Sequence, residues 1–392
     1  MSKPWKDWIP GVLSKNQVKE LCGQYIENVT EPEKAIGYSS IDLTLSDEGY
    51  EMVTGSIKPA GIDYKIAILE NRDYASPSEA GEDGIFTLST GKTYVFRLNE
   101  MLDRLKGSSI YGQATAKSSV GRVDVLARLI VDEMFHYEYF DSKKLPERHV
   151  KMYLEISPIT FNVRVKKGIS LSQLRLFYGR LEDSKKGGAE LCSSVLSRED
   201  KLITEPDLSV DLSEIDICGK SVSAFAAKKQ KKPVDLWKHE NKADRPDPAD
   251  YWECMQVDAR KRLHIEKDRF YIIRSKERLS VPEGIAVYAK AMDETIGEMR
   301  VHYAGFAHPF FGKNRRTSPA GTPLMFEVRE HSFPISLRDA EKLARLEFFR
   351  MSKDCEPSQS EEDLEKESYE DDDYNEQELK LSKFFRDWGE SG

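Results

Sequence analysis

The sequence is poor in cysteine and has no long apolar run, and each absence excludes a class of protein. No apolar segment in the 392 residues approaches the roughly 18 residues that a membrane-spanning helix requires, so we expect no membrane partner. The first residues, MSKPWKDWIPGVL, lack the apolar stretch of a secretory signal. The cysteines are scattered and odd in number, which indicates reduced thiols in a cytoplasm and not a disulfide framework. They are Cys22, Cys192, Cys218, Cys254 and Cys355.

Positive charge is also scarce once the charged residues are located along the chain. The net charge is −9, but the segment 361–378 alone holds eleven Asp and Glu against one Lys, which leaves the rest of the chain near +1. Polymeric nucleic acid requires clustered Lys and Arg, so we exclude it as a partner. One basic cluster, KKQKKP at 228–233, lies in a polar stretch that we interpret as a linker.

Short β-rich runs separated by turn residues make up most of the chain. Between about 36 and 179 they include SSIDLTL and KTYVFRL, and between 264 and 351 they include GIAVYAKA and PLMFEVR. The two regions match each other: 155–177 aligns with 327–349 without a gap, and the alternating apolar positions coincide. The sequence therefore predicts a mainly β chain with two all-β domains of one fold.

We expect four segments along the chain. The first contains a short N-terminal helix within 14–28, because apolar residues recur there at helical spacing after a Ser that could cap the helix. The segments are a first domain at 1–180, a connecting region at 181–250, a second domain at 251–352 and an acidic tail at 353–392 that ends in an aromatic segment. The composition of 361–378 predicts disorder.

The segment AKSSVGR at 116–122 places two cations, two hydroxyls and a glycine between Lys117 and Arg122. It follows a β run, and YLEISP at 153–158 comes later in the chain, with Glu155 inside an otherwise apolar strand. A carboxylate flanked by Tyr153 and Leu154 is expected to be partly desolvated, a setting that suits acid–base chemistry. A set of this kind predicts a site for an anionic substrate.

Each of these residues also has an ordinary interpretation when it is taken alone. Ser118 and Ser119 could be turn hydroxyls, Arg122 a surface ion-pair partner and Glu155 a solvent-facing strand residue. Gln173, in the later β run SLSQLRLF, is more easily read as structural than as catalytic. Only the ordered combination favours a functional site.

At these motifs the chain resembles the dCTP deaminase family, and most closely its long bacterial form with two domains of the trimeric dUTPase fold. The resemblance covers most of residues 10–351 and implies two tandem dUTPase-like domains of β-barrel or jelly-roll type. It also implies a homo-oligomer, either a trimer or a multiple of one. The matching segments are SSIDLTL (39–45), GQATAKSSVGRVDV (112–125), YLEISPITFNVRVKKGISLSQLRLF (153–177), GEMRVHYAGF (297–306), HPFFG (308–312) and MFEVREHSFPISL (325–337).

The resemblance implies that the AKSSVGR loop binds the nucleotide at a subunit boundary. Ser118, Ser119 and Arg122 would contact the nucleotide, with Gly121 in the same loop and Lys117 in the position of a basic residue just before it. Ser118 and Arg122 would orient the attacking water, the base and the phosphates. Charge-assisted hydrogen bonds of about 1.5–3 kcal/mol each would suit a triphosphate.

The resemblance also places the catalytic glutamate in a Leu-Glu strand, which here is Leu154–Glu155. Glu155 would deprotonate water for attack on C4 of cytosine and then deliver protons to the ring and to the departing ammonia. Asp132, in RLIVD, would take the place of an aspartate near the sugar. We include Tyr153, Leu154 and Gln173 among the candidate substrate-binding residues.

The second domain offers an alternative glutamate but no second copy of the loop. Glu327 matches Glu155 in the repeat, and it could complete a site opened by Ser118 and Arg122 because sites in this fold combine neighbouring domains; we favour Glu155. HPF at 308–310 replaces an Asp-Pro-Gly of the long family. We therefore expect a degenerate second domain. Its loop residues, two of which would repel a triphosphate, are Glu294, Thr295, Gly297 and Glu298.

The zinc motif of many nucleobase deaminases is missing. HIE at 264–266 resembles its first half, but no C-x-x-C follows. We therefore expect a mechanism without zinc, in which Mg²⁺ is bound only through the nucleotide phosphates. The expected reaction is hydrolytic deamination of dCTP to dUTP and ammonia, which supplies dUTP for dTMP synthesis.

Two other functions stay open, and so does the role of the C-terminal segment. The chain could be a dUTP pyrophosphatase or a bifunctional deaminase–dUTPase, or a catalytically silent nucleotide-binding scaffold. The aromatic segment LKLSKFFRDWG at 379–389 is expected to dock on the body. Docking could close a site mouth, as C-terminal arms do in the dUTPase fold, or it could serve stability or partner binding.

Overall fold

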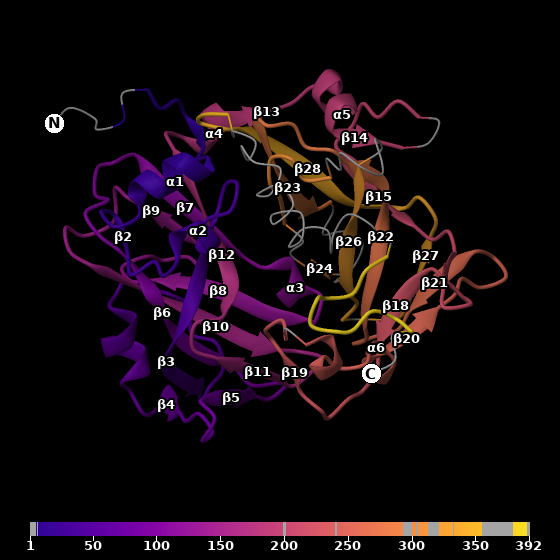
Figure 1. Cartoon of the computed structure of the whole chain (residues 1–392), viewed down its shortest axis with the longest axis horizontal. Coiled ribbons are helices and arrows are strands. Elements are labelled where there is room, and N and C mark those ends of the chain that lie inside the picture. Colours follow the sequence, from indigo (N-terminus) through magenta and orange to yellow (C-terminus); the bar gives the residue numbers. More distant parts are fainter. Residues whose placement is uncertain are drawn as a thin grey trace.

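Strands dominate the computed structural model, which describes residues 5, 7–198, 201–239, 241–292, 300–302, 305–312, 321–331, 333–354 and 379–389. They form two large sheets, one from the indigo and purple half of the chain and one from the magenta-to-orange half (Figure 1). The prediction of a mainly β chain with two β units is confirmed. Within the described residues, no helix is both long enough and apolar enough to cross a membrane.

The first sheet has the strand order β8-β10-β6-β3-β12-β7-β9, and β1, β2 and β4 pair with its members. Its strands alternate as the sequence predicts: in β3, Ile41 and Leu43 face the core, whereas Asp42 and Thr44 are partly exposed. The bounds are β1 Gly11–Val12, β2 Ile26–Glu27, β3 Ile41–Met52, β4 Ala75–Ser78, β6 Tyr94–Leu102, β7 Ile110–Ala116, β8 Val125–Val131, β9 Tyr139–Asp141, β10 Val150–Pro158 and β12 Ser170–Tyr178.

The second sheet has the order β20-β18-β22-β15-β28-β23-β25, and β26 pairs with both β22 and β24 beside this path. The short strands β13 and β14 pair with β28 and β22. The bounds are β13 Lys185–Lys186, β14 Leu196–Ser197, β15 Asp207–Asp211, β18 Ala224–Ala227, β20 Trp252–Met255, β22 Phe270–Leu279, β23 Ile285–Ala291, β24 Arg300–His302, β25 Phe306–Ala307, β26 Thr322–Arg329 and β28 Lys342–Arg350.

The internal repeat is visible in the positions of the strands. The offset that aligns Glu155 with Glu327 also aligns the first residues of β10, β11 (Val163–Lys166) and β12 with those of β26, β27 (Ile335–Arg338) and β28. In addition, β15 pairs with β22 and β28 in the way that β3 pairs with β6 and β12. The two sheets are therefore built on one plan.

Residues 181–250, which the sequence analysis assigns to a connecting region, carry strands of the second sheet. β15 and β18 both pair with β22, and β19 (Val234–Asp235) runs parallel to β11 of the first half. Strands of two to five residues with charged flanks are too short to produce a clear periodic signal, which is why the sequence reads as polar and irregular. This segment is part of the second β unit and ties it to the first.

The N-terminal helix is shorter than the predicted span. α1 runs over Lys15–Leu21 and begins at Ser14, whose backbone N donates to Gln17 Oε1 at 3.0 Å. It ends because Cys22 is extended and Gly23 has φ +82°. The remaining short elements are α2 Pro32–Ala35, η1 Lys65–Leu69, β5 Ile85–Leu88, α3 Ser118–Gly121, α4 Leu181–Ser184, α5 Ala189–Val195, β16 Ile215–Ile217, β17 Lys220–Val222, η2 Lys242–Asp244, α6 Pro248–Tyr251 and β21 Arg262–Ile265.

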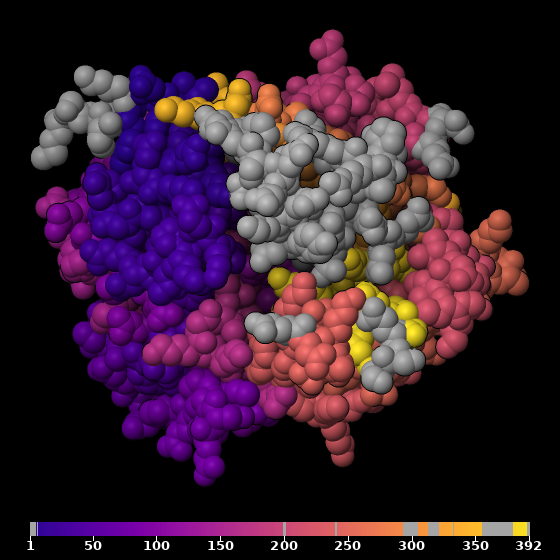
Figure 2. Space-filling model, viewed as in Figure 1, coloured from indigo at the N-terminus to yellow at the C-terminus, as the bar shows by residue number. Residues whose placement is uncertain are grey.

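The C-terminal segment 379–389 docks on the body, as the sequence predicts. It joins a hydrophobic core that contains residues from both halves of the chain, through four buried side chains: Leu379, Leu381, Phe384 and Phe385. The ring of Trp388 stacks on Phe225 with 5.4 Å between centroids. Figure 2 shows this segment, in yellow, set into the surface beside the second half. The acidic segment 361–378 and the loop residues 294–298 lie outside the described residues.

Candidate active site

The segment AKSSVGR forms one helical turn, α3, between β7 and β8 of the first sheet. The amide of Gly121 donates to Lys117 O at 3.1 Å, and the amide of Arg122 donates to Ser118 O at 3.0 Å. Asp124 closes the turn with φ +56°, a left-handed conformation that Asp adopts more readily than most residues. Ser118 and Arg122 are four residues apart, so the turn places them on one face.

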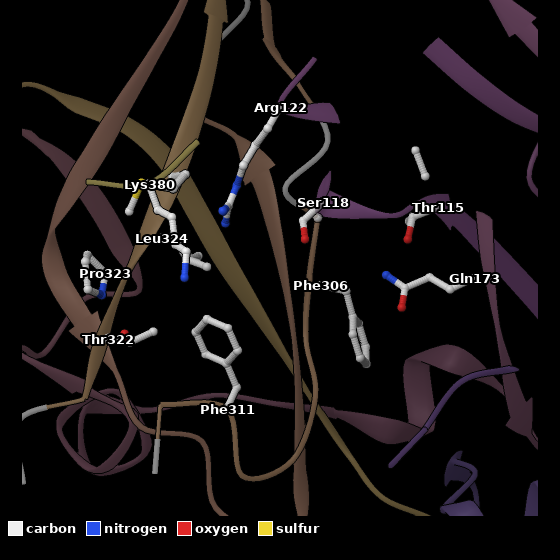
Figure 3. Close-up of a pocket in the computed structure, with 13 residues that line it drawn as sticks. Thr115, Ser118, Arg122, Gln173, Phe306, Phe311, Thr322, Pro323, Leu324 and Lys380 are labelled. Carbon is white, nitrogen blue, oxygen red and sulfur yellow. The ribbon is translucent and has the colours of Figure 1, made fainter. Parts of the chain in front are cut away.

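A pocket opens at this face, and both halves of the chain line it (Figure 3). Its polar groups are hydroxyls, an amide, a guanidinium and an ammonium, and the rings of Phe306 and Phe311 stand across from the turn. The described residues that line it carry no carboxylate, so the pocket suits an anion. They are Thr115, Ala116, Ser118, Arg122, Gln173, Gly305, Phe306, Phe311, Thr322, Pro323, Leu324, Met325 and Lys380.

One carboxylate, that of Glu327 on β26, lies directly beside the turn. Glu327 is two residues beyond the pocket-lining Met325, so both side chains are on one face of the strand. A Cβ atom added at Gly121 would lie only 2.8 Å from Glu327 Cδ and closer still to Oε2. Glycine is therefore the residue that allows this carboxylate to reach the turn.

The surroundings of Glu327 strongly disfavour its ionised form. The residue has no exposed surface, and neither carboxylate oxygen has a hydrogen-bond partner among the described residues. Burial raises the pKa of Glu327 to about 8, and the neighbouring positive charge of Arg122 acts in the opposite direction. A buried carboxyl group without a partner is costly, and its presence beside a pocket is typical of acid–base sites.

Glu155, which we favoured from the sequence, lies in a different set of contacts. Its Oε1 accepts from Arg128 Nε at 3.0 Å and from Ser56 Oγ at 3.1 Å, and its Oε2 accepts from Tyr137 OH at 3.0 Å. Arg128 is its register partner on β8. Within the chain, the structure brings Glu327 and not Glu155 to the Ser118–Arg122 turn, and the catalytic role expected of Glu155 stays a prediction.

Asp132, Tyr153 and Leu154 do not line the pocket either. Asp132 is buried, its Oδ1 accepts from Tyr64 N at 2.9 Å, and desolvation raises its pKa to about 6. Tyr153 packs beside Tyr64 in a small core, and Leu154 lies in the main core of the first half. These residues support the first sheet, and the sequence-based placement of Asp132 near the sugar receives no support from its position.

The remaining residues of the sequence-based set are found at or near the pocket. Gln173 lines it, as do Ser118 and Arg122. Ser119 is buried beneath the turn. Lys117 forms an ion pair with Asp42 on β3 and does not appear on the pocket wall. The hydroxyl and cation donors predicted from AKSSVGR are therefore divided between the pocket and the support of the turn.

The C-terminal segment supplies a pocket residue that the sequence analysis did not assign. Lys380 lines the pocket, Ser382 Oγ donates to Ser119 O at 2.7 Å, and Arg122 Nη1 donates to Leu381 O at 3.4 Å. The segment thus binds the same turn that carries Ser118. A lysine within an aromatic segment that was expected to dock was the one available sign of this role. The sequence does not show which part of the body the segment contacts.

The HPF segment at 308–310 packs against the first half. His308 stacks on Tyr38 with 5.2 Å between ring centroids, and Phe310 lies at the same distance from Tyr38. The following residue, Phe311, lines the pocket.

A possible metal cluster lies elsewhere. Among the described residues, Glu27, Asp103 and His149 place one ligand atom each within 4.8 Å of one another. The contact of His149 Nδ1 with Glu27 Oε2 is 3.1 Å, so the group is also a simple ion-pair cluster. None of the three residues lines the pocket, and the cluster has no part in the site.

The chain matches one protein family over most of its length. Residues 9–180 match the family described as 2'-deoxycytidine 5'-triphosphate deaminase (DCD) N-terminal domain, and residues 189–385 match the C-terminal domain of the same family. No curated protein matches the sequence.

Among solved structures, the crystal structure of 2'-deoxycytidine 5'-triphosphate deaminase from Agrobacterium tumefaciens is similar, with a TM-score of 0.76 and 27% sequence identity over 88% of this chain and 96% of that one. The resemblance stated from the motifs and the tandem dUTPase-like fold are both confirmed. The chain belongs to the 2'-deoxycytidine 5'-triphosphate deaminase family, whose members are hydrolytic deaminases.

Proposed function

We propose that the pocket binds dCTP and that Glu327 is the general acid/base that converts it to dUTP and ammonia. The observation that carries the proposal is a fully buried carboxyl group without a hydrogen-bond partner among the described residues. It lies directly beside the turn whose Ser118 and Arg122 line the pocket, although Glu327 itself is not one of the lining residues. A pKa of about 8 lets this group exchange a proton near neutral pH. The product dUTP would supply dTMP synthesis.

In this mechanism the ionised Glu327 takes a proton from water while the water oxygen bonds to C4 of cytosine. The proton passes to N3 of the ring. The second proton of the attacking water is then transferred to the amino group, the C4–N bond breaks, and ammonia leaves a uracil ring. Water enters and ammonia departs, so the step is a hydrolysis without change of oxidation state. A positioned acid/base of this kind contributes about 10²–10⁴ in rate.

The pocket lining supports a division of labour around the nucleotide. Arg122 and Lys380 would bind the triphosphate, since each supplies a positive charge from a different segment. Ser118 would orient the water or the base, and Phe306 and Phe311 would flank the cytosine ring. The described wall lacks carboxylates, so Mg²⁺ would be held by the phosphates and water, and it would neutralise phosphate charge.

The test is ammonia release from dCTP in the presence of Mg²⁺ by three proteins: wild type, Glu327→Gln and Glu155→Gln. Glu327→Gln should lose at least about 10²-fold in kcat while it still binds dCTP, and Glu155→Gln should retain wild-type kcat. Full activity in Glu327→Gln would overturn the assignment of this residue. Zinc content by elemental analysis and pyrophosphate release from dUTP would check the metal and the pyrophosphatase alternative in the same experiment.

Assembly and location stay predictions. The resemblance implies a homotrimer or a multiple of one, and the reduced thiols favour a cytoplasmic protein. Analytical ultracentrifugation measures the assembly state directly, and a monomer at micromolar concentration would contradict the first prediction.

A further inference from the structure

An ion pair between Asp124 and Arg329 is buried between the two halves of the chain. Along the sequence, Asp124 is two residues from Arg122 and Arg329 is two residues from Glu327. Arg329 Nη2 on β26 donates to Asp124 Oδ2, and the two side chains are 6% and 0% exposed. Arg329 Nη2 also donates to Thr160 Oγ1, and Thr160 Oγ1 donates to the same Asp124 oxygen at 2.5 Å. The other guanidinium end, Nη1, bonds to the backbone O of Asp268. The pair is thus held from both halves of the chain.

The Asp124–Arg329 pair lies beside the proposed catalytic pair, Arg122 and Glu327. Glu327 and Arg329 are two residues apart on β26, so both side chains project from one face of the strand. Across from them, Arg122 and Asp124 are also two residues apart in the turn that follows α3. Arg122 therefore faces Glu327 while Asp124 faces Arg329, and the charges alternate in sign.

The other copy of the repeat lacks this arrangement. The alignment that places Glu327 on Glu155 places Arg329 on Ser157. The Ser157 hydroxyl bonds instead to Thr93 Oγ1 at 2.9 Å, within the first sheet. The second copy of the repeat therefore has an arginine two residues after its glutamate, whereas the first copy has a serine at that position.

Stability alone is a weak reason for such a pair. A buried ion pair gains little over apolar side chains of similar size, because desolvation offsets most of the attraction between the charges. What the pair does provide is a fixed distance between two surfaces. The fork of Arg329 can satisfy Asp124, Thr160 and Asp268 O together only when β26 and the turn are in register.

We propose that Asp124 and Arg329 form a positioning pair, which holds Glu327 against Gly121 and sets the charge around it during deamination. The inference rests on the proposed role of Glu327 and adds two residues that act through it. Neither residue lines the pocket, and their charged groups bind each other, so both are expected to act through Glu327 and not on the nucleotide.

The charges around Glu327 make this role measurable by pH. Arg122 lowers the pKa of Glu327, and Asp124 raises it. Arg329 lies on the same strand, Lys380 lines the pocket, and the register partners of Glu327 are Ile272 on β22 and His302 on β24. Loss of the Asp124 charge should therefore lower the pKa of Glu327, and loss of the Arg329 charge should raise it.

The experiment measures kcat, KM and the pH profile of dCTP deamination for Asp124→Asn, Arg329→Met and Arg329→Lys in the full-length protein. We expect kcat to fall about 100-fold in the first two variants, as a misplacement of about 1 Å can cause, with KM changed less than about threefold. The acid limb of kcat/KM should move to lower pH in Asp124→Asn and to higher pH in Arg329→Met. Arg329→Lys should lose about tenfold in kcat and keep the wild-type limb, because it keeps the charge but not the fork.

Arg164→Met is the matched control. It removes another Arg–Asp pair between the halves, with Asp235, in which Arg164 Nη2 lies 2.7 Å from Asp235 Oδ2 and neither residue lines the pocket. Wild-type kcat in this control would show that the effect belongs to the Asp124–Arg329 pair.

Three results would overturn the proposal: wild-type kcat and pH limbs in folded Asp124→Asn and Arg329→Met, limbs that move in the same direction, or an equal loss of kcat in Arg164→Met. If circular dichroism shows that Arg329→Met does not fold, Asp124→Asn and Arg329→Lys decide by the same criteria. Full activity in Glu327→Gln would instead refute the proposed function, so the two failures are distinguishable.

Discussion

A methyl group at Gly121 should disable the enzyme while leaving it folded. Gly121 lies in α3, so its backbone is helical and accepts alanine without strain. The added Cβ would lie 2.8 Å from Glu327 Cδ and from Oε1, whereas ordinary contact begins at 3.4 Å. The carboxylate is the end of a flexible side chain, so it can move, but it must retreat by about 1 Å from its position beside the turn.

The size of the effect follows from that displacement. A misplacement of about 1 Å in a reacting group can cost about 10² in rate, which corresponds to about 2.7 kcal/mol of transition-state stabilisation. The effect on stability should be smaller. Alanine in place of glycine in a helical turn gains up to about 1 kcal/mol, and this gain offsets part of the roughly 1–3 kcal/mol that overpacking costs.

The assay is ammonia release from dCTP by Gly121→Ala, with thermal denaturation of the same samples. Gly187→Ala is the control, because a Cβ added there meets nothing within 4 Å. We expect kcat to fall about 100-fold in Gly121→Ala and to stay at the wild-type value in the control. Wild-type kcat in a Gly121→Ala protein that melts like the wild type would refute the placement of Glu327 at the reaction centre.

Four other substitutions or conditions test the same interpretation of the site. Glu155→Gln should keep wild-type activity but lose about 1.5–3 kcal/mol of stability by thermal denaturation, because it weakens the charged hydrogen bonds to Arg128; lost activity at unchanged stability would contradict this. With dCTP, kcat/KM should rise about tenfold per pH unit toward pH 8 and level off above it, because Glu327 acts as a base only when it is ionised; a flat profile from about pH 6 to 9 would argue against that role. Since the pKa of Glu327 is raised from 4.5 to about 8 by folding, its contribution to stability is present below 4.5 and is lost as pH rises through 8, so Glu327→Gln should gain melting temperature relative to wild type across that window. Lys380→Met should raise KM for dCTP by about tenfold with little change in kcat, whereas Lys383→Met, which lies outside the pocket, should leave KM unchanged.

Much of the fold was predictable because the repeat is carried by regular strands. One offset relates β10, β11 and β12 to their counterparts because these strands and the turns between them keep the same spacing in both copies. The region 181–250 was not predictable in the same way. β15 runs only over Asp207–Asp211, so no period could be measured, and its pairing with β22 and β28 depends on contacts distant in sequence.

The turn of the candidate site was predictable, whereas the glutamate that lies beside it was not. Lys117–Arg122 is a local motif whose donors are close in sequence, so their grouping survives any arrangement of the domains. Glu155 and Glu327 occupy equivalent positions in the repeat, and strand pattern alone cannot separate them. What separates them is the neighbouring strand: Glu155 is opposite Arg128 on β8, and Glu327 is opposite His302 on β24.

On the proposed function, the duplication divides one site between two copies. The first copy keeps the turn with Ser118 and Arg122, while its own Glu155 is neutralised by Arg128 and bonded on both oxygens. The second copy supplies Glu327, which remains buried without a hydrogen-bond partner among the described residues. An arginine opposite Glu327 would satisfy that carboxylate and lower its pKa, as charged partners do, and so would remove the property that suits it to proton transfer. If Glu327 is the general acid/base, as we propose, a salt bridge is compatible with the role of Glu155 in the first sheet but not with the role of Glu327 in the second.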